Sequence, residues 1–152
     1  MVFVDFVLEN MLIVERYREL ERRVGKNMTN YPVGDFLIKI KNAAMARRKL
    51  VVVPYTKLIY SVSEILKKEK YLSEVKKVED TLSVKVTYMK KEPVLIDLKL
   101  VSKPSKRVYM KADELRGHRG LSFYLVSTPI GVITSREAVK KNVGGEIIAE
   151  IH

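Results

Sequence analysis

The chain has 152 residues, which is enough for one ordinary domain or two small domains that share an interface. It contains no cysteine, and this excludes disulfides, thiolate zinc sites and cysteine nucleophiles. Its 29 Lys and Arg against 18 Asp and Glu give a net charge of +11, which is typical of a protein with a polyanionic partner, either nucleic acid or an anionic membrane surface.

The charge is unevenly distributed along the chain. Residues 1–27 carry five basic and five acidic groups, whereas residues 28–152 carry 24 basic and 13 acidic groups. Asp5 and Glu9 interrupt the apolar start too early for a membrane-spanning helix, which needs roughly 20 apolar residues. Two interpretations of this extension stay open: an amphipathic helix, or a mis-assigned start that makes Met28 the natural first residue.

Two helices and a strand are predicted first. Helix spacing begins near Pro32, a residue that suits a first helical turn, and places on one face Val33, Phe36, Leu37, Ile40 and Ala44. The β-branched run at 50–54 predicts a buried strand. Thr56 is expected to cap a second helix, whose apolar face comprises Leu58, Ile59, Val62, Ile65 and Leu66.

The hydrophobic period then changes to two, which predicts strands. A short strand is expected at 72–78, followed by "TLSVKVTY" at 81–88 and "VLIDLKL" at 94–100. The link "MKKEP" between the last two predicts a hairpin that pairs them. In the second strand, one face is expected to carry Val94, Ile96, Leu98 and Leu100.

The second half is predicted to be mainly strands, at 107–111, 121–126 and 146–151. Thr134 and Glu137 form a capping box, so one short helix is expected at 135–141, with Asn142 as its left-handed end. We therefore expect an α+β protein of two small packed domains. Residues 28–91 form an α/β part of helix-strand-helix-strand-strand, and residues 92–152 form a mainly antiparallel β part with one short helix.

Enzyme chemistry finds little support in this chain. His118 and His152 lack the carboxylate or thiolate neighbours of a metal site, and neither is placed as the base of a serine triad. The glycines do not fit a phosphate-binding P-loop, since Glu146 follows the glycine pair and its charge would repel a phosphate. We expect no catalytic residue, metal, cofactor or small-molecule substrate.

The stretch "VSTPIGVITSREAVKKNVGGEI" at 126–147 is a candidate binding edge. Ser127, Thr128 and Pro129 would leave a strand through a rigid turn with exposed hydroxyls. Gly144 and Gly145 would let the backbone of another molecule come close, because no side chain intervenes. Small hydroxyls and bare backbone suit an irregular RNA surface. The alternative is an ordinary series of turns with a helix cap.

Two basic stretches favour the same partner. In "SKPSKRVYMK", a strand would turn Val108 and Met110 inward and expose Tyr109 beside Arg107 and Lys111, where the ring could stack on a base or simply cover the sheet edge. In "KIKNAAMARRK", a basic helix end at 39–49 could contact phosphates or form a solvated face.

With these residues in view, the chain resembles the bacterial type of small-subunit ribosomal protein eight from about residue 30 to residue 151. The resemblance is carried by four ordered segments, "PVGDFLIKIKNA", "VPYTKL", "VSKPSKRVYMKADEL" and the glycine-pair stretch above. It implies a two-domain protein of the small subunit that binds the central domain of the ribosomal RNA directly, and that is not an enzyme.

The resemblance also implies which residues contact RNA. These are Lys41, Asn42, Thr56, Lys57, Lys103, Ser105, Arg107, Tyr109, Ser127, Thr128, Pro129, Gly144, Gly145 and Glu146. Three positions depart from the family pattern. Pro129 and Ile130 stand where Ser and Lys are common, which removes one phosphate-reaching cation, and Ser105 stands where glycine is common.

Three functional hypotheses follow. The first is a cytoplasmic structural RNA-binding protein of the small subunit, with neighbouring ribosomal proteins and, as the family implies, its own operon messenger RNA as further partners and with no membrane partner. The second is a free RNA-binding regulator that uses the same surface. The third is a nucleotide-dependent enzyme, which no motif supports.

Overall fold

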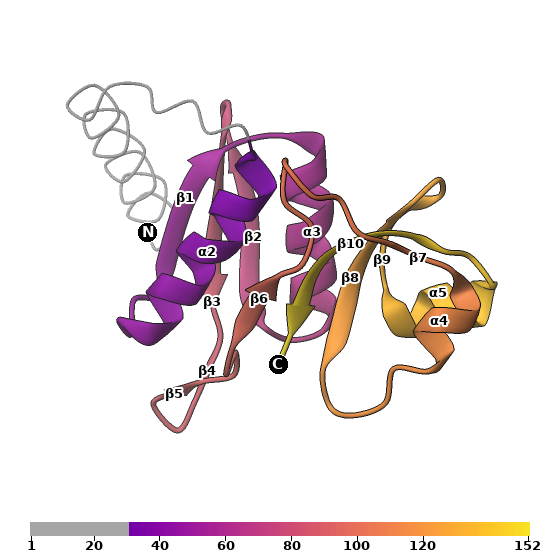
Figure 1. The fold of residues 1–152 in the computed structure, drawn as a ribbon. Coiled ribbons are helices and arrows are strands. Elements are labelled where there is room, and N and C mark those ends of the chain that lie inside the picture. Colours follow the sequence, from indigo (N-terminus) through magenta and orange to yellow (C-terminus); the bar gives the residue numbers. More distant parts are fainter. Residues whose placement is uncertain (1–30) are drawn as a thin grey trace, which may run out of the picture.

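The computed structural model describes residues 31–152 (Figure 1). The helix expected within residues 1–27 and the alternative start at Met28 lie outside this range. The first five elements described are α2 (Pro32–Met45), β1 (Leu50–Pro54), α3 (Lys57–Lys68), β2 (Leu72–Val78) and β3 (Thr81–Val86). Their order confirms the predicted helix-strand-helix-strand-strand succession.

Both long helices begin at the residues that were expected to start them. Pro32 occupies the first turn of α2, where a missing N–H leaves no hydrogen bond unmade. The Thr56 side chain caps α3 and accepts a hydrogen bond from the Ile59 N–H at 3.1 Å. Leu58 departs from the expected buried face of α3 and is exposed, because the buried face is centred on Ile59, Val62 and Leu66 and Leu58 lies at its edge.

The first sheet is antiparallel, with strand order β1-β3-β2. Val84 of the central strand pairs with Val51 on one side and Val75 on the other. Helix α2 packs on β1, and α3 packs on β2. The two helices also contact β6 (Leu98–Leu100) and β9 (Gly131–Thr134) of the second sheet, so they join the two halves of the fold.

The predicted pairing of residues 81–88 with 94–100 is wrong. The predicted hairpin does form, but it pairs only β4 (Tyr88–Met89) with β5 (Glu92–Pro93), as a separate two-stranded sheet. The chain then crosses to the second sheet, where β6 pairs with β10 (Gly145–Ile151). The expected alternation fails with it: Leu95 is buried and Ile96 is 84% exposed. Alternation had to fail here, because only residues 98–100 lie in a strand.

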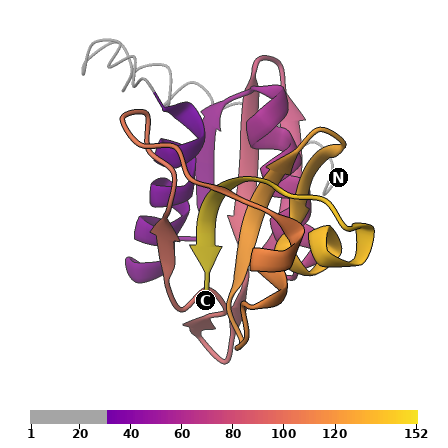
Figure 2. The same cartoon turned by 45° about the vertical axis from the view of Figure 1, so that its right-hand side comes forward.

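The second sheet has the order β6-β10-β8-β9, and β7 (Tyr109–Met110) also pairs with β10. Figure 2 shows β10 between β6 and β8 (Phe123–Thr128). Strand β9 and the short helix α4 (Ala112–Arg116) were not predicted. Helix α5 (Ser135–Lys141) has its predicted cap, with the Thr134 hydroxyl accepting from the Glu137 N–H at 3.2 Å, and ends at left-handed Asn142.

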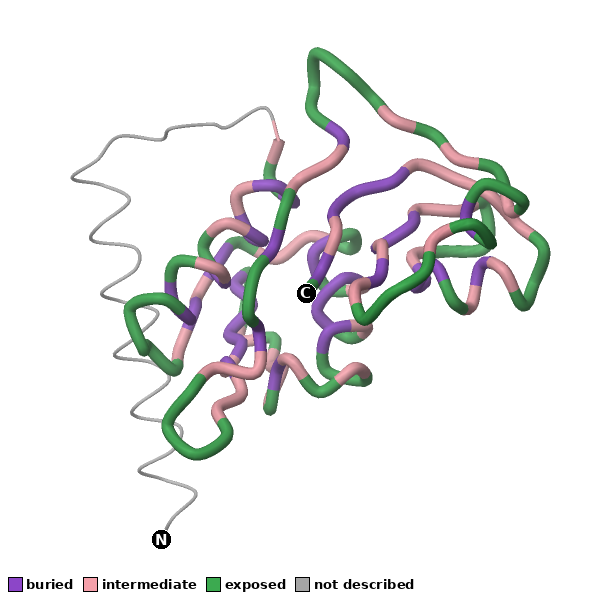
Figure 3. The backbone as a smooth tube through the Cα atoms, turned by 60° about the horizontal axis from the view of Figure 1, so that its bottom comes forward, coloured by how far each residue is buried: buried purple, intermediate pink, exposed green. Residues whose placement is uncertain are grey.

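Both faces of the second sheet pack against other elements, and Figure 3 shows the buried residues of β10 in purple just before the C-terminus. One face joins the large core of α2, α3 and the first sheet, and the other packs on α4 and α5. A β-bulge between Ile147 and Ala149 turns both Ile148 and Ala149 toward the larger core, whereas Ile147 faces the smaller one. Because the larger core contains side chains from both halves, the division into residues 28–91 and 92–152 stays a prediction.

The glycine pair has a structural role that differs from the one expected. A Cβ added at Gly144 would lie 2.8 Å from the Lys111 Cα and would collide with the Met110 carbonyl oxygen. At Gly145 it would collide with the Ser127 carbonyl oxygen and lie 2.9 Å from the carbonyl carbon. The close approach is therefore to the protein's own backbone, and these glycines allow β10 to lie between β7 and β8.

No helix within residues 31–152 combines the length and the apolar character that a membrane span requires. The same residues contain no cluster of three or more His, Asp or Glu side chains that could hold a metal ion.

The end of α3 generates a prediction about stability. Lys70 follows the C-cap with φ +68°, and the Tyr71 N–H closes the turn on the Leu66 carbonyl at 2.9 Å. Glycine adopts this conformation without the steric cost that lysine bears, so Lys70→Gly should raise the free energy of unfolding by about 1 kcal/mol. Lys67→Gly, inside the same helix, should lower it by roughly 0.5–1 kcal/mol in urea denaturation. Equal effects of both substitutions would contradict the account.

A second prediction concerns Gly145. Because a methyl group there has no space against the Ser127 carbonyl, Gly145→Ala should destabilise the fold by about 1–3 kcal/mol. Gly117→Ala is the matched control, since its Cβ would meet only the Glu114 carbonyl oxygen, at 3.3 Å, and should change stability by about 0.5 kcal/mol or less. Thermal unfolding of the two variants decides, and an unchanged Gly145 variant would refute the close approach.

Candidate nucleic-acid interface

The start of β10 gathers three of the predicted residues in one row across the sheet. Glu146 pairs with Tyr109 of β7 on one side and with Ser127 of β8 on the other. Residues directly opposite in an antiparallel sheet extend their side chains on the same face. The Tyr109 side chain is 67% exposed, which confirms the outward orientation expected from the sequence.

The β8–β9 hairpin places two hydroxyls beside this row, but both residues are half-buried, and the Thr128 hydroxyl is used within the turn and is not free as expected. The Thr128 hydroxyl donates to the Gly131 carbonyl at 2.7 Å and accepts from the Ile130 N–H at 3.3 Å, so it closes the turn around exposed Pro129. Gly131 has φ +122°, a conformation that favours glycine. The half-buried Ser127 hydroxyl makes no hydrogen bond to another residue in the described range, which leaves it available to a ligand.

A basic turn leads into β7. Two backbone hydrogen bonds of 2.9 Å between Lys103 and Lys106 close it, and Ser105 is exposed within it. Arg107 follows, and its Nη1 donates to Glu146 Oε1 at 2.9 Å. This hydrogen bond raises the pKa of Arg107 above its ordinary value. Arg107 therefore neutralises Glu146, and the lysines of the turn carry the uncompensated charge.

A shallow depression of about 550 Å³ lies beside the row. Its lining comes from β7, the start of α4 and the end of α5, and it includes Tyr109, Gly144 and Gly145. Two carboxylates, Asp113 and Glu114, also line it. The depression therefore offers an aromatic face, bare backbone and hydrogen-bond acceptors, which together suit a splayed base better than a phosphate.

Thr56 and Lys57 begin α3, at the upper end of the molecule where the β8–β9 hairpin also ends (Figures 1 and 2). The Thr56 hydroxyl oxygen already accepts the capping hydrogen bond, which leaves its hydrogen to donate. Lys57 is exposed in the first helical turn. These two residues share an end of the molecule with the interface, and their contact with RNA stays a prediction.

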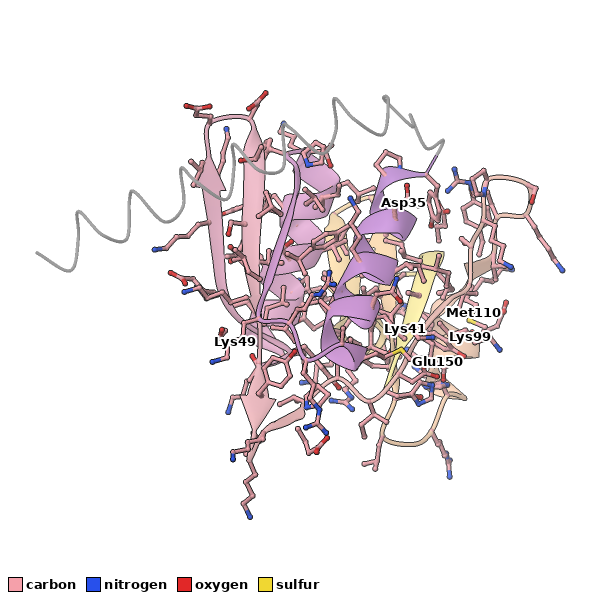
Figure 4. All side chains as sticks on the ribbon, turned by 90° about the vertical axis from the view of Figure 1, so that its left-hand side faces the viewer. Asp35, Lys41, Lys49, Lys99, Met110 and Glu150 are labelled. Carbon is pink, nitrogen blue, oxygen red and sulfur yellow. The ribbon has the colours of Figure 1, made fainter. Side chains whose placement is uncertain are left out.

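Lys41 and Asn42 lie elsewhere. Lys41 Nζ forms an ion pair of 3.0 Å with Asp97, and this hydrogen bond lowers the pKa of the Asp97 carboxyl. The backbone carbonyl of Asp97 accepts a hydrogen bond from the N–H of His152. His152 follows the end of β10 that lies farthest from Glu146, roughly 20 Å along the strand. Figure 4 shows Lys41 on α2, and the Lys99–Glu150 pair of β6 and β10 belongs to the same end of β10 as His152. The structure does not bring Lys41 and Asn42 to the interface.

Sequence reasoning missed Tyr31, which precedes α2. Its ring lies 5.2 Å from the Arg107 guanidinium carbon and fills the space above Gly34. The available signal was a glycine in the first turn of a helix, three residues after an aromatic residue, because a glycine inside a helix is costly unless a neighbour needs the space.

Comparisons with known proteins agree with this fold. A model of the family described as ribosomal protein S8 matches residues 31–152. A "small ribosomal subunit protein uS8" of Enterococcus faecalis is 41% identical over 126 residues, which cover 79% of this chain and 96% of that protein. Proteins of the same name from Gluconobacter oxydans and Oleidesulfovibrio alaskensis are 40% and 38% identical, over 79% and 82% of this chain and 96% and 99% of their own lengths.

The match spans every described element, including the β7–β10–β8 row and both flanking turns. S8 proteins are structural ribosomal proteins and not enzymes, in agreement with the expectation from the sequence. The chain belongs to the ribosomal protein S8 family.

Proposed function

We propose that this protein is a structural constituent of the small ribosomal subunit in the cytoplasm, and that it binds the central domain of the small-subunit rRNA directly. The relatives that share most of its length are small-subunit ribosomal proteins. The single observation that carries direct binding is the row of Tyr109, Glu146 and Ser127, which lies between a basic turn and a hydroxyl-bearing hairpin.

Each part of this interface has a separate chemical task. The exposed Tyr109 ring would stack on an unpaired base, and the Ser127 hydroxyl would bind a 2′-OH or a base edge. Lys103 and Lys106 would contact phosphates, which position the RNA without reading its sequence. The depression behind Tyr109 would receive a nucleotide displaced from its helix.

The remaining predicted contacts follow from this placement. Thr56 and Lys57 would extend the interface at the upper end of the molecule, and Lys41 with Asn42 would meet a different part of the RNA or a neighbouring ribosomal protein. Repression of the protein's own message stays a prediction from the family resemblance. A free regulator would wash off small subunits at high salt, whereas a structural constituent would co-sediment with them.

The aromatic contact gives the first test. Tyr109→Ala should weaken binding to a transcript of the rRNA central domain by about 1–3 kcal/mol, because stacking on one base is lost. Met89→Ala removes an exposed large side chain from the β4–β5 hairpin, at the lower end of the molecule, and should leave affinity unchanged. Electrophoretic mobility shift measures both, and equal affinities for the Tyr109 variant and the unaltered protein would contradict the interface.

The basic turn gives the second. The binding constant falls as salt rises, so a plot of its logarithm against the logarithm of salt concentration has a negative slope. Lys103→Ala should make this slope shallower by about one, because one phosphate contact is removed. The matched control is Lys90→Ala, at the exposed tip of the β4–β5 hairpin at the lower end of the molecule (Figure 1). If the slope becomes shallower for Lys90→Ala and not for Lys103→Ala, the RNA binds at the lower end of the molecule and the proposed interface is wrong.

A further inference from the structure

The Tyr31 side chain, just before α2, packs against the first turn of that helix. A Cβ at Gly34 would collide with Tyr31 Cδ1 and lie 2.7 Å from Cε1, so the ring occupies the volume that any other residue would fill. Gly34 is itself buried. A glycine in a helix costs stability relative to alanine, and here the cost is explained by the ring that it admits.

The Tyr31 ring also contacts the interface. The Arg107 guanidinium lies over it at 5.2 Å from the ring centroid, within cation–π range, while Nη1 of the same group donates to Glu146 at 2.9 Å. Arg107 is therefore held from two sides, by the start of α2 and by β10. Burial raises the pKa of Tyr31, and the Glu146 carboxylate raises it further, so the phenol is neutral where it meets this ion pair.

This geometry changes the role expected of Arg107. A phosphate-binding arginine has its fork directed to solvent, whereas here one arm is bonded to Glu146 and the guanidinium lies against an aromatic ring. Glu146 gains from the arrangement, because an unpaired carboxylate in an RNA interface would repel phosphates. With Oε1 occupied by Arg107, Oε2 is left to accept a hydrogen bond from an RNA hydroxyl or amino group.

We propose, on the basis of the RNA-binding function above, that Tyr31 is a positioning residue of the interface. Its ring, admitted by Gly34, holds Arg107 on Glu146, so that the carboxylate between Tyr109 and Ser127 reads hydrogen-bond donors on the RNA. Arg107 contributes through Glu146 and makes no phosphate contact of its own. The start of α2 thereby sets the specificity of a site that is built from the second sheet.

The test uses the full chain, a transcript of the rRNA central domain and poly(U) of equal length. Tyr31→Ala should weaken binding to the transcript about tenfold and change poly(U) binding by less than about twofold, since only the specific contact depends on Glu146. Tyr31→Phe should bind as the unaltered protein does, because the buried hydroxyl has no hydrogen-bond partner among the described residues. Loss of transcript binding in the Phe variant would overturn the role given to the ring.

Gly34→Ala tests the position of the Tyr31 ring without changing Tyr31 itself. Alanine favours the helix, yet the added methyl group should displace Tyr31 and reproduce the loss seen in Tyr31→Ala. Gly117→Ala serves as the control for a glycine with more space around it. A Gly34→Ala variant that keeps full discrimination between transcript and poly(U) would overturn the proposal.

Arg107→Lys distinguishes positioning from phosphate binding and does not depend on the folding of the Tyr31 variants. Lysine retains the charge and lacks the planar fork. The preference for the transcript over poly(U) should therefore fall, while the salt dependence of binding stays constant. Retained discrimination would overturn the proposal. The double variant Tyr31→Ala with Arg107→Ala should bind the transcript no more weakly than the worse single variant, and additive losses would also overturn it.

The controls separate this inference from the function on which it rests. If the unaltered protein fails to prefer the transcript over poly(U), the proposed function fails. If the unaltered protein discriminates and Tyr31→Ala discriminates equally, the function stands and the role of Tyr31 fails. Thermal unfolding of each variant identifies any loss that comes from the fold.

Discussion

The arrangement of the second sheet depends on one steric constraint, the absence of side chains at Gly144 and Gly145. Any Cβ at these positions would collide with the backbone of Met110 or Ser127, so only glycine lets β10 begin between β7 and β8. That position pairs Glu146 with Tyr109 and Ser127 and sets the spacing of the row. Ile147 then fills the smaller core, and the bulge turns Ile148 and Ala149, together with Ile151, toward the larger one. The same strand therefore organises the interface at its start and the fold along its length.

The interface separates its neutralised acidic residue from its unpaired basic residues. Glu146 is the one acidic residue in the row, and Arg107 neutralises it, while the uncompensated lysines lie in the adjacent turn. In the proposed complex, acceptor groups would therefore face the part of the RNA that carries sequence, and cations would face its phosphates. The halves of the fold are joined below this region by α2 and α3, which contact both sheets, and by the ion pairs Lys41–Asp97 and Lys68–Glu137.

Local signals predicted local structure well. Thr56, Thr134 and Asn142 mark helix ends through their own hydrogen bonds and backbone angles, so their positions could be derived from a few neighbouring residues. The pairing of residues 94–100 could not be derived in this way, because alternation does not identify the partner of a strand. Strand β6 pairs with β10, which lies about 50 residues further along the chain. The glycine pair was recognised as unusual, yet its reason depends on two strands distant in sequence. Tyr31 was missed because its contact with Arg107 joins the start of the described chain to a turn that is distant in sequence.

The central claim is that the start of β10 and its two neighbouring strands form the surface that meets RNA. The most direct measurement is the change in backbone amide NMR shifts when a transcript of the rRNA central domain is added to the isotope-labelled protein. The account predicts the largest changes at Tyr109, Ser127 and Gly145, with small changes at the Lys41 end of β10. Changes concentrated around Lys41 and Asn42, with the Tyr109 row unaffected, would contradict it.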